Sequence, residues 1–129
     1  MDRIAHADEW LKYVQADLDV VHLLKAHHRP HLEIICFHCQ QAAEKALKAI
    51  LAYHDEEIPR THNLFSVMEL CEAHCPGIVE EFSDHADWLS GFAAAGRYPN
   101  EVETTVEDMN KAIETAESIM SAVKTRIGR

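Results

Sequence analysis

The sequence contains few helix-breaking residues and no apolar run long enough to cross a membrane. Four glycines and four prolines are spread over 129 residues. No apolar run approaches the ~20 residues that a membrane helix needs, and the N-terminal stretch MDRIAHADEW lacks the features of a signal peptide. We therefore expect a cytoplasmic protein that makes no contact with a membrane and keeps its cysteines reduced.

Basic residues are also scarce. Twelve Lys and Arg stand against 22 Asp and Glu, which gives a formal net charge of −10 with histidine neutral. Such a charge repels phosphate backbones at long range, so a long nucleic acid is disfavoured as a partner, although a small basic pocket remains compatible. Protonation of all ten histidines would cancel the −10, so we expect poor solubility at about pH 5 to 6.

The alternation of apolar and polar residues that marks a strand is missing, and apolar residues recur instead at helical spacing. The pattern predicts helices over residues 8–26, 30–53, 64–74, 78–95 and from about 105 to 127. Thr61 or Asn63 can cap the third helix, and Thr104 with Glu107 reads as a capping box for the last. We predict an all-α fold: an up-and-down antiparallel bundle of four to five helices in a single domain, residues 1–129.

The cysteines raise the question of a zinc site or a redox pair. Cys36 and Cys39 lie within the second predicted helix in register with Leu32 and Ile35, and Cys71 is likewise in register on the third. Buried cysteine behaves as a small hydrophobic residue, so core packing is favoured over metal or redox chemistry. Phosphate-binding glycine loops and hydrolase motifs are absent. We therefore expect no metal site, no cofactor and no catalytic residues of those classes.

Polar chemistry gathers on the second predicted helix and in two connections. The candidates for ligand binding or an interface are Asp17, Gln41, Glu44, Lys45, Lys48, His62, Arg97 and Tyr98. Arg97 and Tyr98 stand at a helix break, where an arginine can grip a phosphate or carboxylate and a tyrosine can stack on a base. The competing interpretation is a buried network or dimer interface in which Arg97 pairs with Glu44, or Lys45 with Asp17, which interrupts an apolar stripe.

Several stretches in order resemble the HEPN domain family. They are WLKYVQADLDVVHLL, CFHCQQAAEKALKAIL, PRTHNL and GRYPNE, followed by a closing amphipathic helix, and together they span nearly the whole chain. The resemblance implies a helical bundle, commonly paired into dimers. It also implies a partner or substrate-binding role beside a minimal nucleotidyltransferase, often in a toxin–antitoxin arrangement. Some family members are metal-independent ribonucleases that use an arginine followed four to six residues later by a histidine.

The sequence departs from that ribonuclease pattern. No histidine stands at the required distance after Arg97, and His62 follows Arg60 at only two residues. We therefore expect a non-catalytic subunit that binds a nucleotide or another phosphate-bearing group near Arg97, or that binds a nucleotidyltransferase chain. We also expect a homodimer. The alternatives are a ribonuclease toxin with a rearranged site that uses His62, and a purely structural dimerisation module.

Overall fold

The computed structural model describes residues 2–93 and 103–129, which fold into five α-helices and no strand. The helices are α1 (Arg3–Lys25), α2 (Leu32–Tyr53), α3 (Leu64–Cys71), α4 (Ile78–Ser90) and α5 (Val106–Ile127). The prediction of an all-α bundle is confirmed. No helix among these residues is long and apolar enough to cross a membrane.

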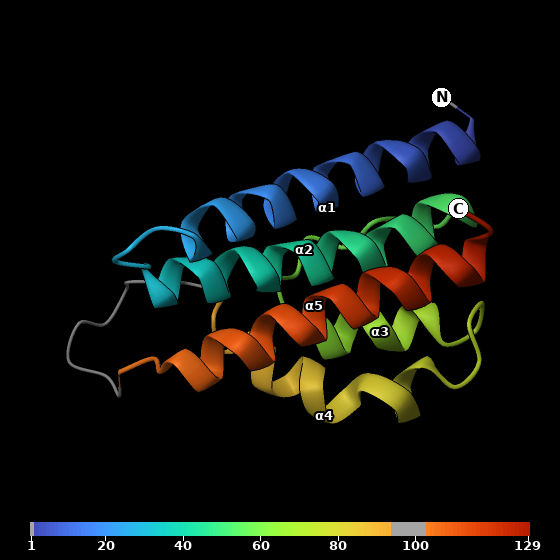
Figure 1. Cartoon of the computed structure of the whole chain (residues 1–129). Coiled ribbons are helices and arrows are strands. Elements are labelled where there is room, and N and C mark those ends of the chain that lie inside the picture. The colour runs from blue at the N-terminus through green and yellow to red at the C-terminus, as the bar shows by residue number, and fades with distance from the viewer. Residues whose placement is uncertain (1, 94–102) are drawn as a thin grey trace.

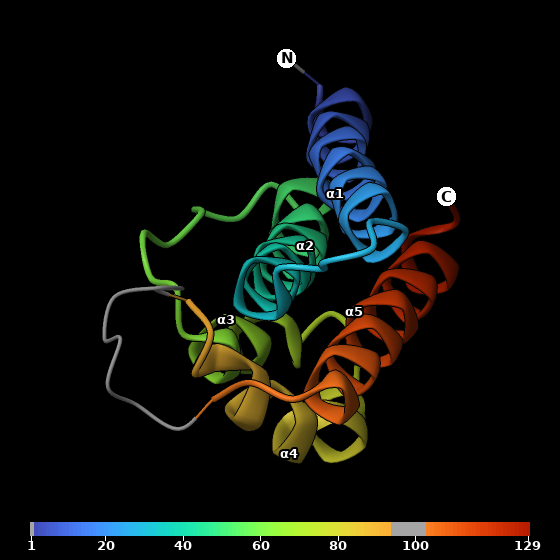
Figure 2. The same ribbon diagram turned by 60° about the vertical axis from the view of Figure 1, so that its left-hand side comes forward.

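Helix α2 is the central element of the bundle. It packs against α1 on one side and α5 on another, and the short helices α3 and α4 cover the face opposite α1 (Figures 1 and 2). Most of α2 is buried, because its alanines and leucines face neighbours on nearly every side. A helix surrounded in this way leaves only a narrow exposed strip, which runs past Ile34 and Gln41 to Lys45.

The connection 54–63 returns along the bundle instead of turning tightly. Helices α1 and α2 are antiparallel, but α2 and α3 run in the same direction (Figure 1). The return is fixed at its far end, where Gln40 Nε2 donates to the carbonyl oxygen of His62 at 3.0 Å. The connection therefore brings His62 beside the middle of α2, well away from the helix end at Tyr53.

Capping side chains account for the observed starts of α1, α3 and α5. Helix α1 begins at Arg3, five residues before the predicted start, because the Asp2 carboxylate accepts from the Ala5 amide at 2.9 Å. Asn63, and not Thr61, caps α3 through the Ser66 amide. The predicted capping box of α5 was one residue out of place: the pair is Thr105 and Asp108, which exchange bonds of 3.0 Å.

Helix α2 begins at Leu32, two residues later than predicted, and helices α3 and α4 end earlier than predicted. Helix α3 ends at Cys71 instead of residue 74, and Glu72 then accepts from the amides of Gly77 and Val79. These bonds cover the start of α4, where Gly77 adopts a φ of 94° that favours glycine. Helix α4 ends at Ser90, whose hydroxyl accepts from the Leu64 amide at 2.9 Å. Residues 94 and 95 of its predicted end lie outside the described residues.

The cysteines pack in the core. Cys36, Cys39 and Cys71 are 0% exposed and Cys75 is 3% exposed, all as free thiols. Burial raises the pKa of Cys36, Cys39 and Cys71 to about 12. The Cys71 thiol donates to the Leu47 carbonyl at 3.3 Å. The prediction that helical register places the cysteines of α2 and α3 in the core is confirmed.

Candidate ligand-binding site

A buried carboxylate, Glu44 on α2, organises the first of two polar clusters. Its Oε1 accepts from the His62 ring at 2.9 Å and from Gln40 at 3.2 Å. Its Oε2 accepts from Lys48 Nζ at 2.9 Å. The Glu44 side chain is 5% exposed and that of Lys48 is 7% exposed, whereas His62 is 65% exposed. The buried carboxylate of Glu44 therefore holds the solvent-exposed His62 imidazole in a fixed position.

The cluster is saturated with hydrogen bonds. No buried side-chain nitrogen or oxygen lacks a partner in the part of the chain that the structure describes. A buried ion pair is tolerated when further hydrogen bonds satisfy both groups, and the Gln40 and His62 contacts supply them for Glu44. Gln41, half-buried at the edge, donates to Gln40 Oε1 at 2.7 Å. Gln40, Gln41, Glu44 and Lys48 of α2 thus form one continuous hydrogen-bond network with the returning connection.

Asp17 centres the second cluster, at the contact between α1 and α2. Lys45 Nζ donates to its Oδ2 at 2.7 Å, and His38 Nδ1 lies 3.0 Å from its Oδ1. Asp17 is 8% exposed. The sequence-based pairing of Lys45 with Asp17 is confirmed, and it explains why a carboxylate is accepted within the apolar stripe of α1.

The structure places six of the predicted site residues in these two clusters. Glu44, Lys48, His62 and Gln41 belong to the first, and Asp17 and Lys45 to the second. Arg97 and Tyr98 lie outside the described residues, and so does the predicted pair of Arg97 with Glu44. Within the described residues, Glu44 is already held by Lys48 and His62.

Two members of these clusters were missed from the sequence, Gln40 and His38. In the sequence Gln40 is one of several polar residues on the second predicted helix, and its link to His62 depends on the course of the connection 54–63. His38 is seven residues before Lys45 and shares its side of α2, which was the available signal. Only the register of α1 against α2 shows that both side chains reach Asp17.

Beside these clusters lies a groove between α1 and α2. His6, Glu9, Trp10 and Tyr13 line it from successive turns of α1, and Lys45 lines it from α2. Its volume is about 730 Å³. Trp10 Nε1 donates to His6 Nε2 at 3.2 Å, and Lys48 Nζ lies 6.0 Å from the centroid of the Trp10 ring. The groove is thus continuous with both polar clusters.

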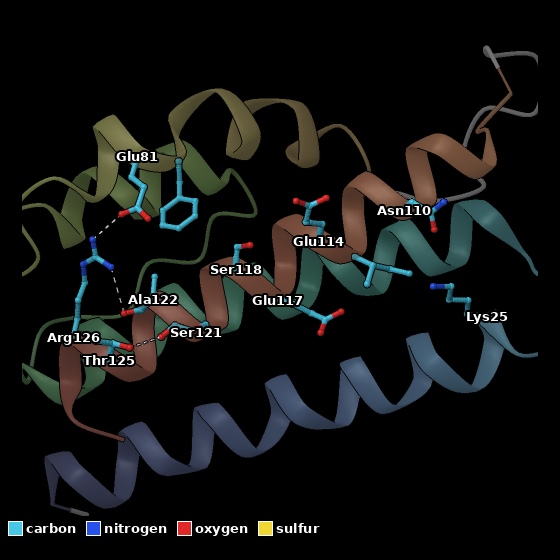
Figure 3. A pocket seen from close by; sticks show the side chains of 12 residues that line it. Lys25, Glu81, Asn110, Glu114, Glu117, Ser118, Ser121, Ala122, Thr125 and Arg126 are labelled. Atoms are coloured by element: carbon cyan, nitrogen blue, oxygen red, sulfur yellow. Dashed lines mark hydrogen bonds and ion pairs between the residues drawn. The ribbon is translucent and has the colours of Figure 1, made fainter.

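A second hollow runs along α5 beside α4 and is shown in Figure 3. Carboxylates of Glu81, Glu114 and Glu117 line it. Its Arg126 is engaged by Glu81 at 2.9 Å and by the Ala122 carbonyl at 3.4 Å. With three carboxylates against Lys25 and with its guanidinium occupied, this hollow is poorly suited to a phosphate-bearing ligand.

Known proteins share this architecture. The model of the HEPN domain family matches residues 7–126. The chain belongs to the HEPN domain family. A crystal structure of an archaeal HEPN homologue has the same fold, with a TM-score of 0.73 and 25% sequence identity. The alignment covers 95% of this chain and 98% of that one. No curated protein matches.

The arginine–histidine spacing of the ribonuclease pattern occurs nowhere in the sequence. None of Arg3, Arg29, Arg60, Arg97, Arg126 and Arg129 is followed four to six residues later by a histidine. The described residues also contain no group of three or more His, Cys, Asp or Glu arranged to hold a metal ion.

Proposed function

We propose that this HEPN protein is a non-catalytic binding subunit that takes a nucleotide or a similar phosphate-bearing ligand and partners a minimal nucleotidyltransferase chain. One observation carries the proposal: no arginine in the sequence has the histidine spacing of the ribonuclease motif. Without that arginine–histidine pair, the chain lacks the two groups that would act together on the scissile phosphate and the 2′-hydroxyl.

The α1–α2 side of the bundle supports a binding role. Its polar groups are held by buried partners, so they are ordered before any ligand arrives, and this lowers the entropic cost of binding. The net charge of −10 restricts the ligand to something small, because a long anionic polymer is repelled. A nucleotide meets both conditions.

Exposed apolar side chains support a partner role. Ile34 on α2 is 45% exposed and Leu23 on α1 is 73% exposed. Both lie on long helices, where exposed apolar side chains can be covered by a second copy or by another chain. The proposal therefore includes a homodimer, in a toxin–antitoxin type of system with the nucleotidyltransferase.

Three measurements test the proposal. The purified protein should leave single-stranded RNA intact in EDTA, should melt at a higher temperature with nucleotide, and should co-purify with a nucleotidyltransferase encoded beside it. Arg97→Ala should abolish the nucleotide-induced rise in melting temperature and should destabilise the fold only modestly. Metal-independent cleavage of RNA that disappears in Arg97→Ala would defeat the non-catalytic function.

A ribonuclease with a rearranged site is the second candidate, because of one contact. His62 is exposed and its Nδ1 is held by the buried Glu44, an arrangement that orients an imidazole for proton transfer. RNA cleavage that is lost in His62→Gln would favour this candidate. A purely structural dimerisation module is the third; a stable dimer that binds neither nucleotide nor partner chain would favour it.

A further inference from the structure

The groove between α1 and α2 has an aromatic wall. Trp10 and Tyr13 are three residues apart on α1, so both rings lie on the groove side of the helix. Tyr13 is 54% exposed to solvent, and Trp10 is half-buried. The bond from Trp10 Nε1 to His6 fixes the orientation of the indole. A rigid, accessible aromatic surface of this kind is suited to stacking a planar ring.

The cations around the groove are already neutralised. Lys45 is paired with Asp17 at 2.7 Å, and Lys48 with Glu44 at 2.9 Å. The groove therefore attracts a neutral ring more readily than a multiply charged phosphate. Its volume of about 730 Å³ falls within the range of small-molecule sites. These properties favour the base end of a nucleotide as the occupant.

Glu9 supplies the remaining polar group of the groove. It is exposed, and within residues 2–93 and 103–129 it makes no hydrogen bond or ion pair with another side chain. A carboxylate only accepts hydrogen bonds, through two oxygens side by side. Its best partner is a ring edge that presents two adjacent donors. Guanine does so, through its ring N1–H and its 2-amino group.

We infer that this groove binds the guanine base of a nucleotide, stacked against Trp10 and Tyr13, with its two-donor edge paired to the Glu9 carboxylate. The inference rests on the proposed nucleotide-binding function and names the base. Adenine and cytosine offer an amino donor beside a ring-nitrogen acceptor, which would face a carboxylate oxygen. Uracil offers one donor between two carbonyl acceptors. Each of these bases leaves an unfavourable contact that guanine avoids.

Fluorescence of Trp10 reports directly on the site. The chain has two tryptophans, and Trp88 lies on α4 across the bundle from α1 (Figure 1). In a Trp88→Phe background the emission comes from Trp10 alone. Titration with guanosine and with GMP should quench it, and GMP should bind about tenfold more tightly than AMP, CMP or UMP. Quenching by guanosine shows that the base, and not the phosphate, contacts the indole.

Two variants and one control complete the experiment. Tyr13→Ala should raise the Kd for GMP about tenfold through lost stacking. Glu9→Gln should raise the Kd for GMP by a similar factor and should lower that for AMP, because the amide can donate to the adenine ring nitrogen, so that the preference for guanine disappears. Glu80→Gln makes the same change of charge on an exposed residue of α4 and should change neither Kd. Circular dichroism confirms that each variant is folded.

The outcomes separate this inference from the proposed function. If nucleotides raise the melting temperature but neither quench Trp10 nor respond to Tyr13→Ala, the ligand binds elsewhere: the inference is wrong and the proposed function stands. Equal affinity for all four nucleotides, unaffected by Glu9→Gln, also overturns the choice of guanine. If no nucleotide raises the melting temperature or quenches Trp10, the nucleotide-binding function fails, and the inference fails with it.

Discussion

The His62 imidazole and the Glu44 carboxylate lie 2.9 Å apart, although the two residues are separated by 18 positions in the sequence. This contact joins the central helix to the connection that returns along it. It also sets the exposed ring at a fixed place on the α1–α2 side of the bundle, because Glu44 itself is held by Lys48 from the next turn.

Removing the Glu44 carboxylate should strongly destabilise the fold. Glu44→Ala leaves the Lys48 ammonium, 7% exposed, without its buried partner. The free energy of unfolding should fall by about 3 to 5 kcal/mol, the usual result of breaking a buried ion pair. Urea denaturation followed by circular dichroism measures it. The double variant Glu44→Leu with Lys48→Met should recover much of the loss; a loss of under about 1 kcal/mol in Glu44→Ala would show that the pair is not effectively buried.

The buried thiols should be chemically silent in the folded protein. Because burial raises the pKa of Cys36, Cys39 and Cys71 to about 12, these cysteines hold no thiolate at pH 8. A thiol reagent at pH 8 should label none of the three until denaturant is added. Rapid labelling of Cys36 or Cys39 without denaturant would contradict their place in the core.

The same thiols predict a loss of stability in strong alkali. The unfolded chain releases thiol protons around pH 9, whereas the folded chain keeps them until about pH 12. Stability from these groups is therefore complete below pH 9 and declines as the pH rises through this interval. Melting temperatures from pH 8 to 11 measure the decline. Cys36→Ala with Cys39→Ala should make it shallower, and should lower stability at pH 7 by about 1 to 3 kcal/mol per site.

His54 should make the protein sensitive to mild acid. Partial burial, the stacked ring of His74 at 4.1 Å and the nearby Arg3 lower the pKa of His54 below its ordinary 6.5. Its contribution to stability is then present above pH 6.5 and is lost as the pH falls below that value. His54→Gln should reduce the fall in melting temperature between pH 7.5 and 5.5. His27→Gln, on the exposed turn after α1, serves as the control; equal effects of the two variants would contradict the assignment.

The homodimer remains a prediction, and the narrow exposed strip of α2 allows a direct test. Ile34 is 45% exposed there, with half-buried Phe37 one turn further on. Sedimentation at tens of micromolar should give the dimer mass, and Ile34→Glu should shift it towards the monomer, because a charge would then be buried in the interface. Leu70→Glu, which places the same charge on α3, is the matched control. A monomer mass for the unmodified protein would refute the prediction.

Helical periodicity was sufficient for the all-α class, because apolar spacing at 3.6 residues identifies the buried face of each helix without reference to its neighbours. It did not reveal that α2 and α3 run in the same direction (Figure 1), which departs from a strict up-and-down order. It was also sufficient for the cysteines, whose register places them in the core. Helix ends were less accurate, as the one-residue error at Thr105 shows, since neighbouring threonines offer the same cap. The pair of Asp17 and Lys45 followed from the rule that buried charges are paired. The contacts of His38 and His62 depend on helix register and on the return of a ten-residue connection, which no local pattern encodes.

The return of residues 54–63 along α2 has a consequence for the order of folding. Helices α1 and α2 follow each other directly and bury a large apolar face against each other, so this antiparallel pair can form early. The Gln40–His62 bond, by contrast, is a single polar contact that requires α2 to be in place already. Variants in the connection should therefore speed unfolding and hardly change the refolding rate, with φ-values near zero. Variants at Val14 or Leu47 in the core should slow refolding, because the α1–α2 hairpin would form the nucleus on which the connection later closes.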